Sequence, residues 1–163
     1  MYKKYAAFSL LEVLVVVVVI GILAAMVIPK LANAKGKTSI ASAAEDLEGI
    51  AQVLSHYQAV HGTFPPNASR AKDAVMLKPY FKDFTPFQTR TPIGGVYDYI
   101  GLTGSNPVSI AIVNELQNEF SRAQAQELDD YMDDGKLSGG RIKLVNGQLQ
   151  YRFADTTSVV EDD

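Results

Sequence analysis

One carboxylate in this sequence stands where carboxylates are rare. Glu12 lies inside the run from Phe8 to Ile28, whose other members are apolar except for Ser9. A charged carboxylate in the middle of an apolar membrane helix costs roughly 2.5–3.5 kcal/mol on insertion scales. Two interpretations follow. Either Glu12 lies near the lipid headgroups, where the cost is small, or it pairs with a cationic group in another chain.

Four more carboxylates gather late in the chain, at Asp129, Asp130, Asp133 and Asp134. They fall near the C-terminal end of an expected helix, where negative charge opposes the helix dipole. A bound calcium ion would relieve the repulsion, although the spacing does not match an EF-hand loop. The alternative is a solvated acidic helix end that binds nothing.

The residues that act as nucleophiles and bases in enzymes form no catalytic arrangement. The chain has no cysteine, which excludes disulfides, thiolate nucleophiles and cysteine metal sites. His56 and His61 are five positions apart and do not share a helix face, and Ser138 has no partner base at a recognisable spacing. The turn at 91–95 lacks the pattern of a phosphate-binding loop. The sequence therefore predicts a protein that is not an enzyme.

The composition limits the number of domains and the classes of binding partner that the chain can have. The 163 residues, 47% hydrophobic and 20% charged, suit one domain with an anchor. The net charge is −3 and no basic patch is dense enough to indicate nucleic-acid binding. No nucleic-acid partner is expected, and no cofactor other than a structural calcium ion.

The apolar run itself predicts a membrane-spanning helix. Its 21 residues would span about 31 Å, enough for the apolar core of a bilayer. Lys3 and Lys4 precede it, so the positive-inside rule places the N-terminus in the cytoplasm and the rest of the chain outside. A cleaved secretory signal has a shorter apolar stretch. Here the run continues into a second helical pattern, which favours an anchor.

The segment Phe-Ser-Leu-Leu-Glu-Val-Leu-Val-Val at 8–16, after a short basic leader, resembles the class III signal motif of type IV pilins and type II secretion pseudopilins. In that family a prepilin peptidase cuts before the phenylalanine and methylates the new amine. The resemblance implies cleavage between Ala7 and Phe8 and N-methylation of Phe8. The family usually has glycine before the cut, and Ala7 is the next smallest residue.

The resemblance also implies how the subunit assembles. The family glutamate, here Glu12, neutralises the N-terminal ammonium of a neighbouring subunit, and Pro29 falls where members carry a helix-kinking proline. Implied partners are a homo-oligomeric helical filament, an assembly platform and an ATPase. The implied location is the bacterial inner membrane before assembly and a periplasmic or extracellular filament afterwards. Some major pseudopilins carry structural calcium near the C-terminal region.

Beyond the membrane the helical pattern continues. Apolar residues at helical spacing predict a buried stripe of Ile40, Ala43, Ala44, Leu47, Ile50, Ala51, Leu54, Tyr57 and Gln58. The expected polar side carries Lys35, Lys37, Glu45, Asp46, Glu48 and Gln52. Pro29 is expected to bend or locally open the helix, and Gly62 to end it. The expected organisation is a leader at 1–7, a transmembrane and polymerisation helix at 8–29, an amphipathic stalk at 30–61 and a globular head at 62–163.

The head is expected to be a small antiparallel β structure with an additional helix, which gives an α+β, type IV pilin-like fold. Strands are predicted at 96–101 and 108–113, a short helix near 72–81, and a helix over 115–134 capped by Asn114. The inner stripe of that last helix is predicted as Leu116, Phe120, Ala123, Leu128 and Tyr131. Asn146-Gly147 predicts a type I′ hairpin that pairs Val145 with Gln148.

These features predict a structural subunit of a type IV pilus or a type II secretion pseudopilus, serving adhesion or protein transport. The alternative is a minor pilin-like, membrane-anchored binding module at a filament tip. A trunk subunit predicts abundant self-assembly that is lost when Glu12 is changed, whereas a minor subunit predicts low abundance and no long homopolymer. A secreted hydrolase is a third alternative, for which no catalytic residues are present.

Overall fold

The computed structural model describes residues 9–67, 75–82, 86–101, 107–114 and 119–154. The chain divides into two compact units, residues 1–38 and 39–163, and helix α1 (Leu10–His61) contributes to both. The predicted leader and the cleavage position between Ala7 and Phe8 lie outside the described residues.

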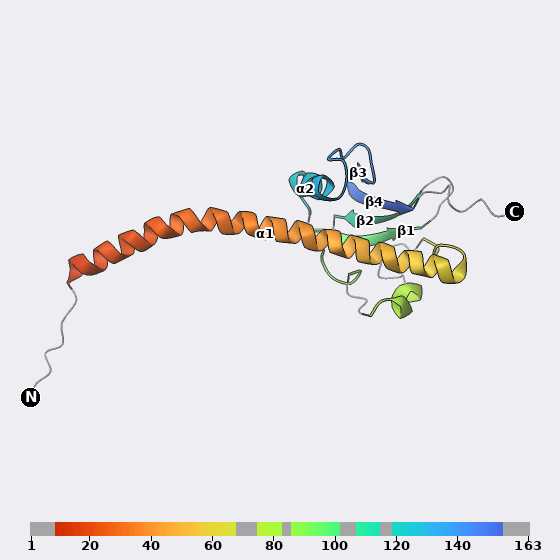
Figure 1. The fold of residues 1–163 in the computed structure, drawn as a ribbon, viewed down its shortest axis with the longest axis horizontal. Coiled ribbons are helices and arrows are strands. Elements are labelled where there is room, and N and C mark those ends of the chain that lie inside the picture. The colour runs from red at the N-terminus through yellow and green to blue at the C-terminus, as the bar shows by residue number, and fades with distance from the viewer. Residues whose placement is uncertain (1–8, 68–74, 83–85, 102–106, 115–118, 155–163) are drawn as a thin grey trace, which may run out of the picture. The chain divides into compact units, whose positions relative to one another are not determined.

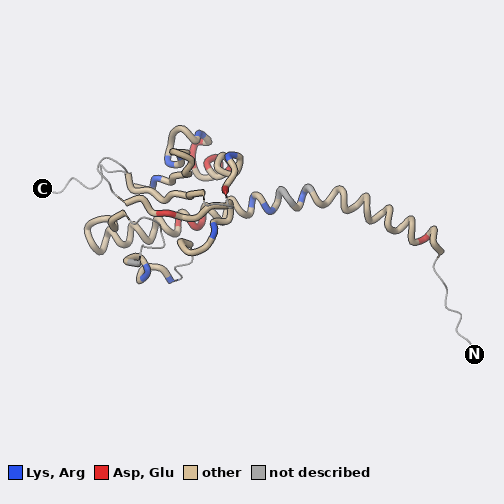
Figure 2. Tube along the Cα trace, turned by 180° about the vertical axis from the view of Figure 1, so that it is seen from behind, with Lys and Arg blue, Asp and Glu red and all other residues tan. Residues whose placement is uncertain are grey.

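In the first unit α1 is an exposed apolar helix. It begins after Ser9, whose hydroxyl oxygen accepts a hydrogen bond from the Glu12 backbone N at 3.2 Å and so caps the helix. The stretch Leu10–Ile28 has a mean hydropathy of 3.1 and is not buried within the protein, so its length and composition would allow it to cross a membrane. Charged side chains are nearly absent from this stretch (Figure 2). The backbone stays helical through Pro29 and Gly36, so the helix is not opened there.

The second unit contains a four-stranded antiparallel sheet in the order β1-β2-β4-β3. The strands are β1 (Val96–Ile100), β2 (Val108–Val113), β3 (Ile142–Val145) and β4 (Gln148–Ala154). The C-terminal part of α1 lies along this sheet, and helix α2 (Arg122–Met132) lies beside β3 (Figure 1). A 3₁₀ helix, η2 (Val75–Tyr80), stands where a short helix was predicted. This is the α+β pilin-like architecture that the sequence predicts.

One hydrophobic core joins the helix to the sheet. From α1 it receives the predicted stripe, Ile40, Ala43, Ala44, Leu47, Ile50, Ala51 and Leu54. The sheet supplies Tyr97, Tyr99, Ile110, Ile112, Ile142, Leu149 and Tyr151. The stripe is therefore confirmed, although Tyr57 and Gln58 at its end are only half-buried.

Asp46 corrects the predicted polar side of α1. It is half-buried and accepts a hydrogen bond from the Tyr97 hydroxyl at 3.1 Å, which ties the helix to β1. Burial raises the pKa of Asp46, and the hydrogen bond from Tyr97 opposes that rise.

The predicted hairpin is confirmed residue by residue. Val145 pairs with Gln148 and Ile142 with Tyr151, and Asn146 and Gly147 have φ values of 51° and 79°. Positive φ at both central residues is the geometry of a type I′ turn. The register places Ile142, Leu149 and Tyr151 in the core.

The second helix is shorter than predicted. α2 begins at Arg122 because Ser121 and Gln124 form a capping box: the Ser121 hydroxyl accepts from Gln124 N at 3.2 Å, and Gln124 Oε1 accepts from Ser121 N at 2.9 Å. The predicted cap, Asn114, instead accepts a hydrogen bond from Phe120 N. Residues 115–118, including Leu116, lie outside the described residues.

The predicted inner stripe of that helix is partly wrong. Leu128 is buried as expected, but Ala123 is exposed and Tyr131 is 64% exposed. The buried positions of α2 are Ala125, Leu128 and Asp129. The carboxylate of Asp129 therefore lies on the buried face of α2, where the sequence predicts only apolar and aromatic side chains.

Candidate functional site

Glu12 lies in the first turn of α1 and is the only charged residue between Ser9 and Pro29. Its surroundings are large exposed apolar side chains, from Leu10 at 92% to Val19 at 49% exposure. Within the described residues nothing donates a hydrogen bond or a positive charge to its carboxylate. An apolar surface of this size needs lipid or another protein to cover it, and the carboxylate within it needs either the polar headgroup region or a cation.

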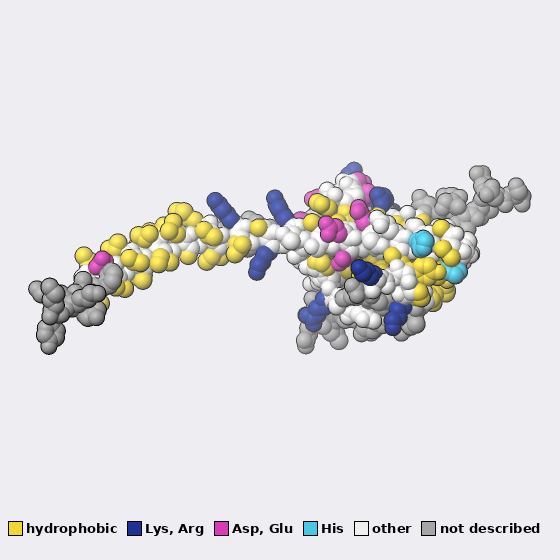
Figure 3. Space-filling view, turned by 60° about the horizontal axis from the view of Figure 1, so that its bottom comes forward, with side chains coloured by type: hydrophobic (Ala, Val, Ile, Leu, Met, Phe, Trp, Pro, Cys, Tyr) yellow, Lys and Arg dark blue, Asp and Glu magenta, His cyan; other side chains and the backbone are white. Residues whose placement is uncertain are grey.

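Basic side chains begin directly after the apolar stretch. Lys30, Lys35 and Lys37 are all exposed, and Figure 3 shows basic side chains projecting from opposite sides of this part of the helix. Together with Glu12, this segment presents an apolar helix with one acid near its start and basic residues past its end.

The structure brings together three of the four predicted aspartates. Carboxylate oxygens of Asp129, Asp133 and Asp134 all lie within 4.8 Å of one another. Asp130 points elsewhere, since its Oδ1 accepts a hydrogen bond from Gln126 Nε2 at 3.0 Å. Asp129, Asp133 and Asp134 are called the acidic cluster below.

Asp129 is the unusual member of the acidic cluster. Its side chain is fully buried, and neither carboxylate oxygen has a hydrogen-bond partner among the described residues. The pKa of Asp129 is raised to about 6, first by burial and then by the charges of Asp133, Asp134 and Asp130 in that order. A buried carboxylate of this kind requires a proton or a cation to compensate its charge.

The loop that follows α2 holds the other two members of the cluster. Asp133 Oδ2 accepts hydrogen bonds from the backbone N atoms of Arg141 and Ile142, and Asp134 Oδ1 accepts from Lys136 N at 2.9 Å. The loop therefore curls back on the end of α2 and leads into β3. Within the described residues, the other carboxylate oxygen of each of these two aspartates accepts no hydrogen bond.

Gly140 allows this loop to approach the cluster. Its φ of +67° favours glycine, and a Cβ there would overlap Asp133 Oδ2 and lie 3.2 Å from Asp134 Oδ1. The cluster is thus enclosed by backbone on one side and by α2 on the other. Three carboxylates in a partly enclosed site are the oxygen ligands that calcium prefers, and the unpartnered Asp129 oxygens fit such an ion.

Gly140→Ala is expected to destabilise the protein by about 2–4 kcal/mol, since it combines left-handed strain with loss of the Asp133 hydrogen bonds. Gly139→Ala is the matched control, because a Cβ at Gly139 meets no atom within 4 Å. Thermal unfolding of the detergent-solubilised proteins measures the stability of both variants. Equal melting temperatures for the two variants would contradict the tight approach at Gly140.

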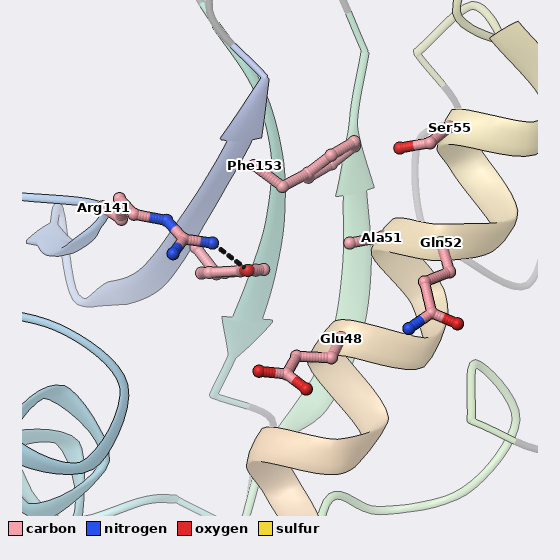
Figure 4. Close-up of a pocket in the computed structure, with 7 residues that line it drawn as sticks. Glu48, Ala51, Gln52, Ser55, Arg141 and Phe153 are labelled. Carbon is pink, nitrogen blue, oxygen red and sulfur yellow. Dashed lines mark hydrogen bonds between the residues drawn. The ribbon is translucent and has the colours of Figure 1, made fainter.

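A surface groove of about 430 Å³ lies elsewhere in the second unit, between α1 and the sheet. Its helix wall is formed by Glu48, Ala51, Gln52 and Ser55, and its sheet wall by Arg141, Tyr151 and Phe153. In Figure 4 the Glu48 carboxylate points across the groove toward the side of Arg141. The Arg141 guanidinium donates to the Tyr151 hydroxyl and lies 5.1 Å from that ring's centroid.

Sequence reasoning missed both the groove and the role of Gly140. Glu48 and Arg141 are far apart in the chain, and neither has a neighbour in sequence that marks it. For Gly140 a signal was present, because Gly139-Gly140 directly precedes a strand and such pairs favour positive φ.

Comparison with known proteins identifies the N-terminal segment. Residues 2–28 match the family model described as prokaryotic N-terminal methylation motif. The chain is also similar to proteins named type II secretion system core protein G. It is 34% identical to that of Aeromonas hydrophila over 77 residues, which cover 47% of this chain and 53% of the relative.

Two further relatives carry the same name. Identity is 35% to the Vibrio cholerae protein and 31% to the Pseudomonas aeruginosa protein, each over 77 residues. These matches cover 52% and 54% of the relatives, so the chain spans about half the length of the curated relatives it matches. The chain therefore carries the prokaryotic N-terminal methylation motif on an α+β pilin-like fold and is similar to type II secretion system core protein G.

Proposed function

We propose that this protein is the structural subunit of a type II secretion pseudopilus and polymerises through the N-terminal part of α1. The observation that carries the proposal is Glu12, a carboxylate that has no partner among the described residues and lies on an apolar helix that none of them covers. A helix of this kind is stable when it is surrounded by lipid or by identical helices. An assembly of identical subunits also provides one N-terminal ammonium for every Glu12 carboxylate.

The proposed cation is the N-terminal ammonium of a neighbouring subunit. A prepilin peptidase would create it by cutting between Ala7 and Phe8, with N-methylation of Phe8. Methylation keeps the positive charge of the amine, so the pairing with Glu12 is retained. Before assembly the subunit is anchored in the inner membrane, and the polymer grows with the help of a secretion platform and its ATPase.

Electron microscopy of material sheared from producing cells, with N-terminal sequencing of the filament protein, tests the proposal. We expect filaments whose subunit begins with methylated Phe8. Cells that lack the peptidase are the control, and their protein should keep residues 1–7 and form no filaments. Uncleaved, monomeric protein in normal cells would overturn the proposal and favour the membrane-anchored, minor binding module.

A structural calcium ion is the second proposal for this chain. Its support is the acidic cluster, where Asp129, Asp133 and Asp134 offer three carboxylates and Asp129 has no other partner among the described residues. The ion would neutralise the buried charge and fix the loop between α2 and β3. Calcium titration of the purified protein, followed by thermal unfolding, measures the effect.

A further inference from the structure

Three lysines follow the apolar stretch of α1, and no acid lies near them in the chain. Lys30, Lys35 and Lys37 are exposed, and none forms an ion pair within the described residues. Residues 13–44 contain these three lysines and no aspartate or glutamate. In the orientation proposed above they lie on the outer side of the membrane, where positive charge opposes the usual charge bias of a span. The direction of insertion therefore does not explain them, and their charge calls for an anionic partner.

The lysines are distributed around the helix rather than along one face. Lys37 lies about 20° from Lys30 around the helix axis, whereas Lys35 lies about 140° from Lys30. Figure 3 shows basic side chains on opposite sides of this part of α1. All three lysines belong to the first compact unit, so these angles depend on α1 alone. A folded protein partner would contact one side of the helix, whereas lipid headgroups surround it on every side.

The lysines also lie at the height of the headgroups. The span Leu10–Ile28 would extend about 28 Å, close to the ~30 Å of a hydrocarbon core. Lys30 is about 3 Å past Ile28 along the axis, within a headgroup layer about 5–7 Å thick. Lys35 and Lys37 are about 10 and 13 Å past Ile28, and side chains of an α-helix tilt toward its N-terminus, which here is toward the membrane. Their charges therefore lie within about 8 Å of the headgroup layer, the Debye length at physiological ionic strength.

We propose that Lys30, Lys35 and Lys37 bind anionic phospholipid headgroups of the outer leaflet and hold the outer end of the span at the headgroup layer. The inference rests on the proposed membrane anchoring and adds the class of lipid that surrounds the subunit before assembly. The stem of Lys30 lies along the apolar chains of the lipid while its ammonium reaches the phosphate. Lys35 and Lys37 attract further anionic headgroups across the short distance to the surface. Glu12 lies at the other end of the span, so the preference for anionic lipid is confined to the outer end.

Quenching of a single tryptophan shows which lipids touch each end of the span, because the chain has no tryptophan of its own. Val27→Trp reports on the outer end and Leu14→Trp on the inner end, and the two side chains are similarly exposed, at 58% and 57%. The full chain is reconstituted in vesicles of phosphatidylcholine and phosphatidylglycerol, with one or the other lipid carrying brominated acyl chains. At Val27→Trp brominated phosphatidylglycerol should be preferred by about fivefold, and at Leu14→Trp neither lipid should be preferred.

Two triple variants in the Val27→Trp chain test whether the lysines cause the preference. Lys30→Gln/Lys35→Gln/Lys37→Gln should remove it, because no cation then remains at the outer end of the span. The matched control removes three exposed lysines of the second unit and should keep the preference; it is Lys78→Gln/Lys82→Gln/Lys136→Gln. Added sodium chloride should weaken the preference of the unsubstituted lysines, since salt screens charges outside the hydrocarbon core.

The outcomes separate the lipid contact from the anchoring on which it rests. Equal quenching by both brominated lipids at Val27→Trp would overturn the lipid contact and leave the anchoring intact. A preference that survives Lys30→Gln/Lys35→Gln/Lys37→Gln, or that the control variant also loses, would overturn the role of these three lysines. If neither brominated lipid quenches either tryptophan, the helix does not enter the bilayer and the proposed anchoring itself fails.

Discussion

Glu12→Ala is expected to abolish filaments while leaving the protein in the membrane. Alanine makes the helix more apolar, so anchoring becomes stronger rather than weaker. Assembly fails because the ammonium of the neighbouring subunit is then buried without a partner. Leaving one member of a buried ion pair uncompensated costs about 3–5 kcal/mol, which corresponds to a loss of roughly a hundredfold or more in subunit addition.

The measurement is a count of filaments by electron microscopy together with the amount of subunit in sheared and membrane fractions. Glu45→Ala is the matched control, because Glu45 is an exposed glutamate on the same helix beyond the apolar stretch. N-terminal sequencing of the membrane-bound variant separates a defect in processing from a defect in assembly. Filaments of Glu12→Ala at wild-type abundance would show that Glu12 has no essential cationic partner.

Asp129→Asn is expected to stabilise the calcium-free protein at pH 7 and to weaken its response to calcium. The pKa of Asp129 is raised from 3.8 to about 6 in the folded protein, mainly by burial. Between these two values the folded state holds a proton that the unfolded state has released, so stability falls as the pH rises from about 4 to about 6. Above pH 6 both states are ionised, and the full penalty of about 3 kcal/mol remains.

Thermal unfolding in a chelator measures this penalty. At pH 7 the variant should melt about 10 °C higher than the wild type, and near pH 4 the difference should be much smaller. Added calcium should raise the melting temperature of the wild type more than that of Asp129→Asn. Asp130→Asn is the control, since Asp130 lies outside the acidic cluster. A calcium response that Asp129→Asn keeps in full would exclude Asp129 as a ligand.

Much of the fold follows from local pattern. The stripe on α1 is predictable because burial recurs at helical spacing over several turns, and no competing signal interrupts it. The β3–β4 register is predictable because Asn146-Gly147 fixes the turn and the alternation on both sides agrees with it.

The start of α2 and its buried face were mispredicted for one reason. The prediction extended the helix back to Glu115 and so set the stripe from Leu116 and Phe120. In the structure the Ser121–Gln124 capping box begins the helix later, and the sheet then decides which face is covered. Burial of Asp129 is a tertiary outcome, because no local preference places a carboxylate next to Leu128 in a core.

The groove was not predictable from the chain for a related reason. Glu48 and Arg141 belong to elements that meet only after the sheet has packed on α1. The sequence predicts the face of the helix on which Glu48 lies. The position of the Arg141 guanidinium opposite it depends on how the β3–β4 hairpin packs, which the sequence does not show. Sites built from one segment, such as Glu12 in its apolar run, are therefore visible in sequence, and sites built from two distant segments are not.

The Asn146-Gly147 turn is a suitable place to insert a label for imaging. Both residues are exposed, a Cβ at Gly147 would meet no atom within 4 Å, and the strands on either side are fixed by four cross-strand pairs. Tight, exposed turns of this kind tolerate inserted residues well. A short epitope spliced into the turn would give each subunit its own reporter, so that growth of a fibre on a living cell becomes visible under an antibody or a dye.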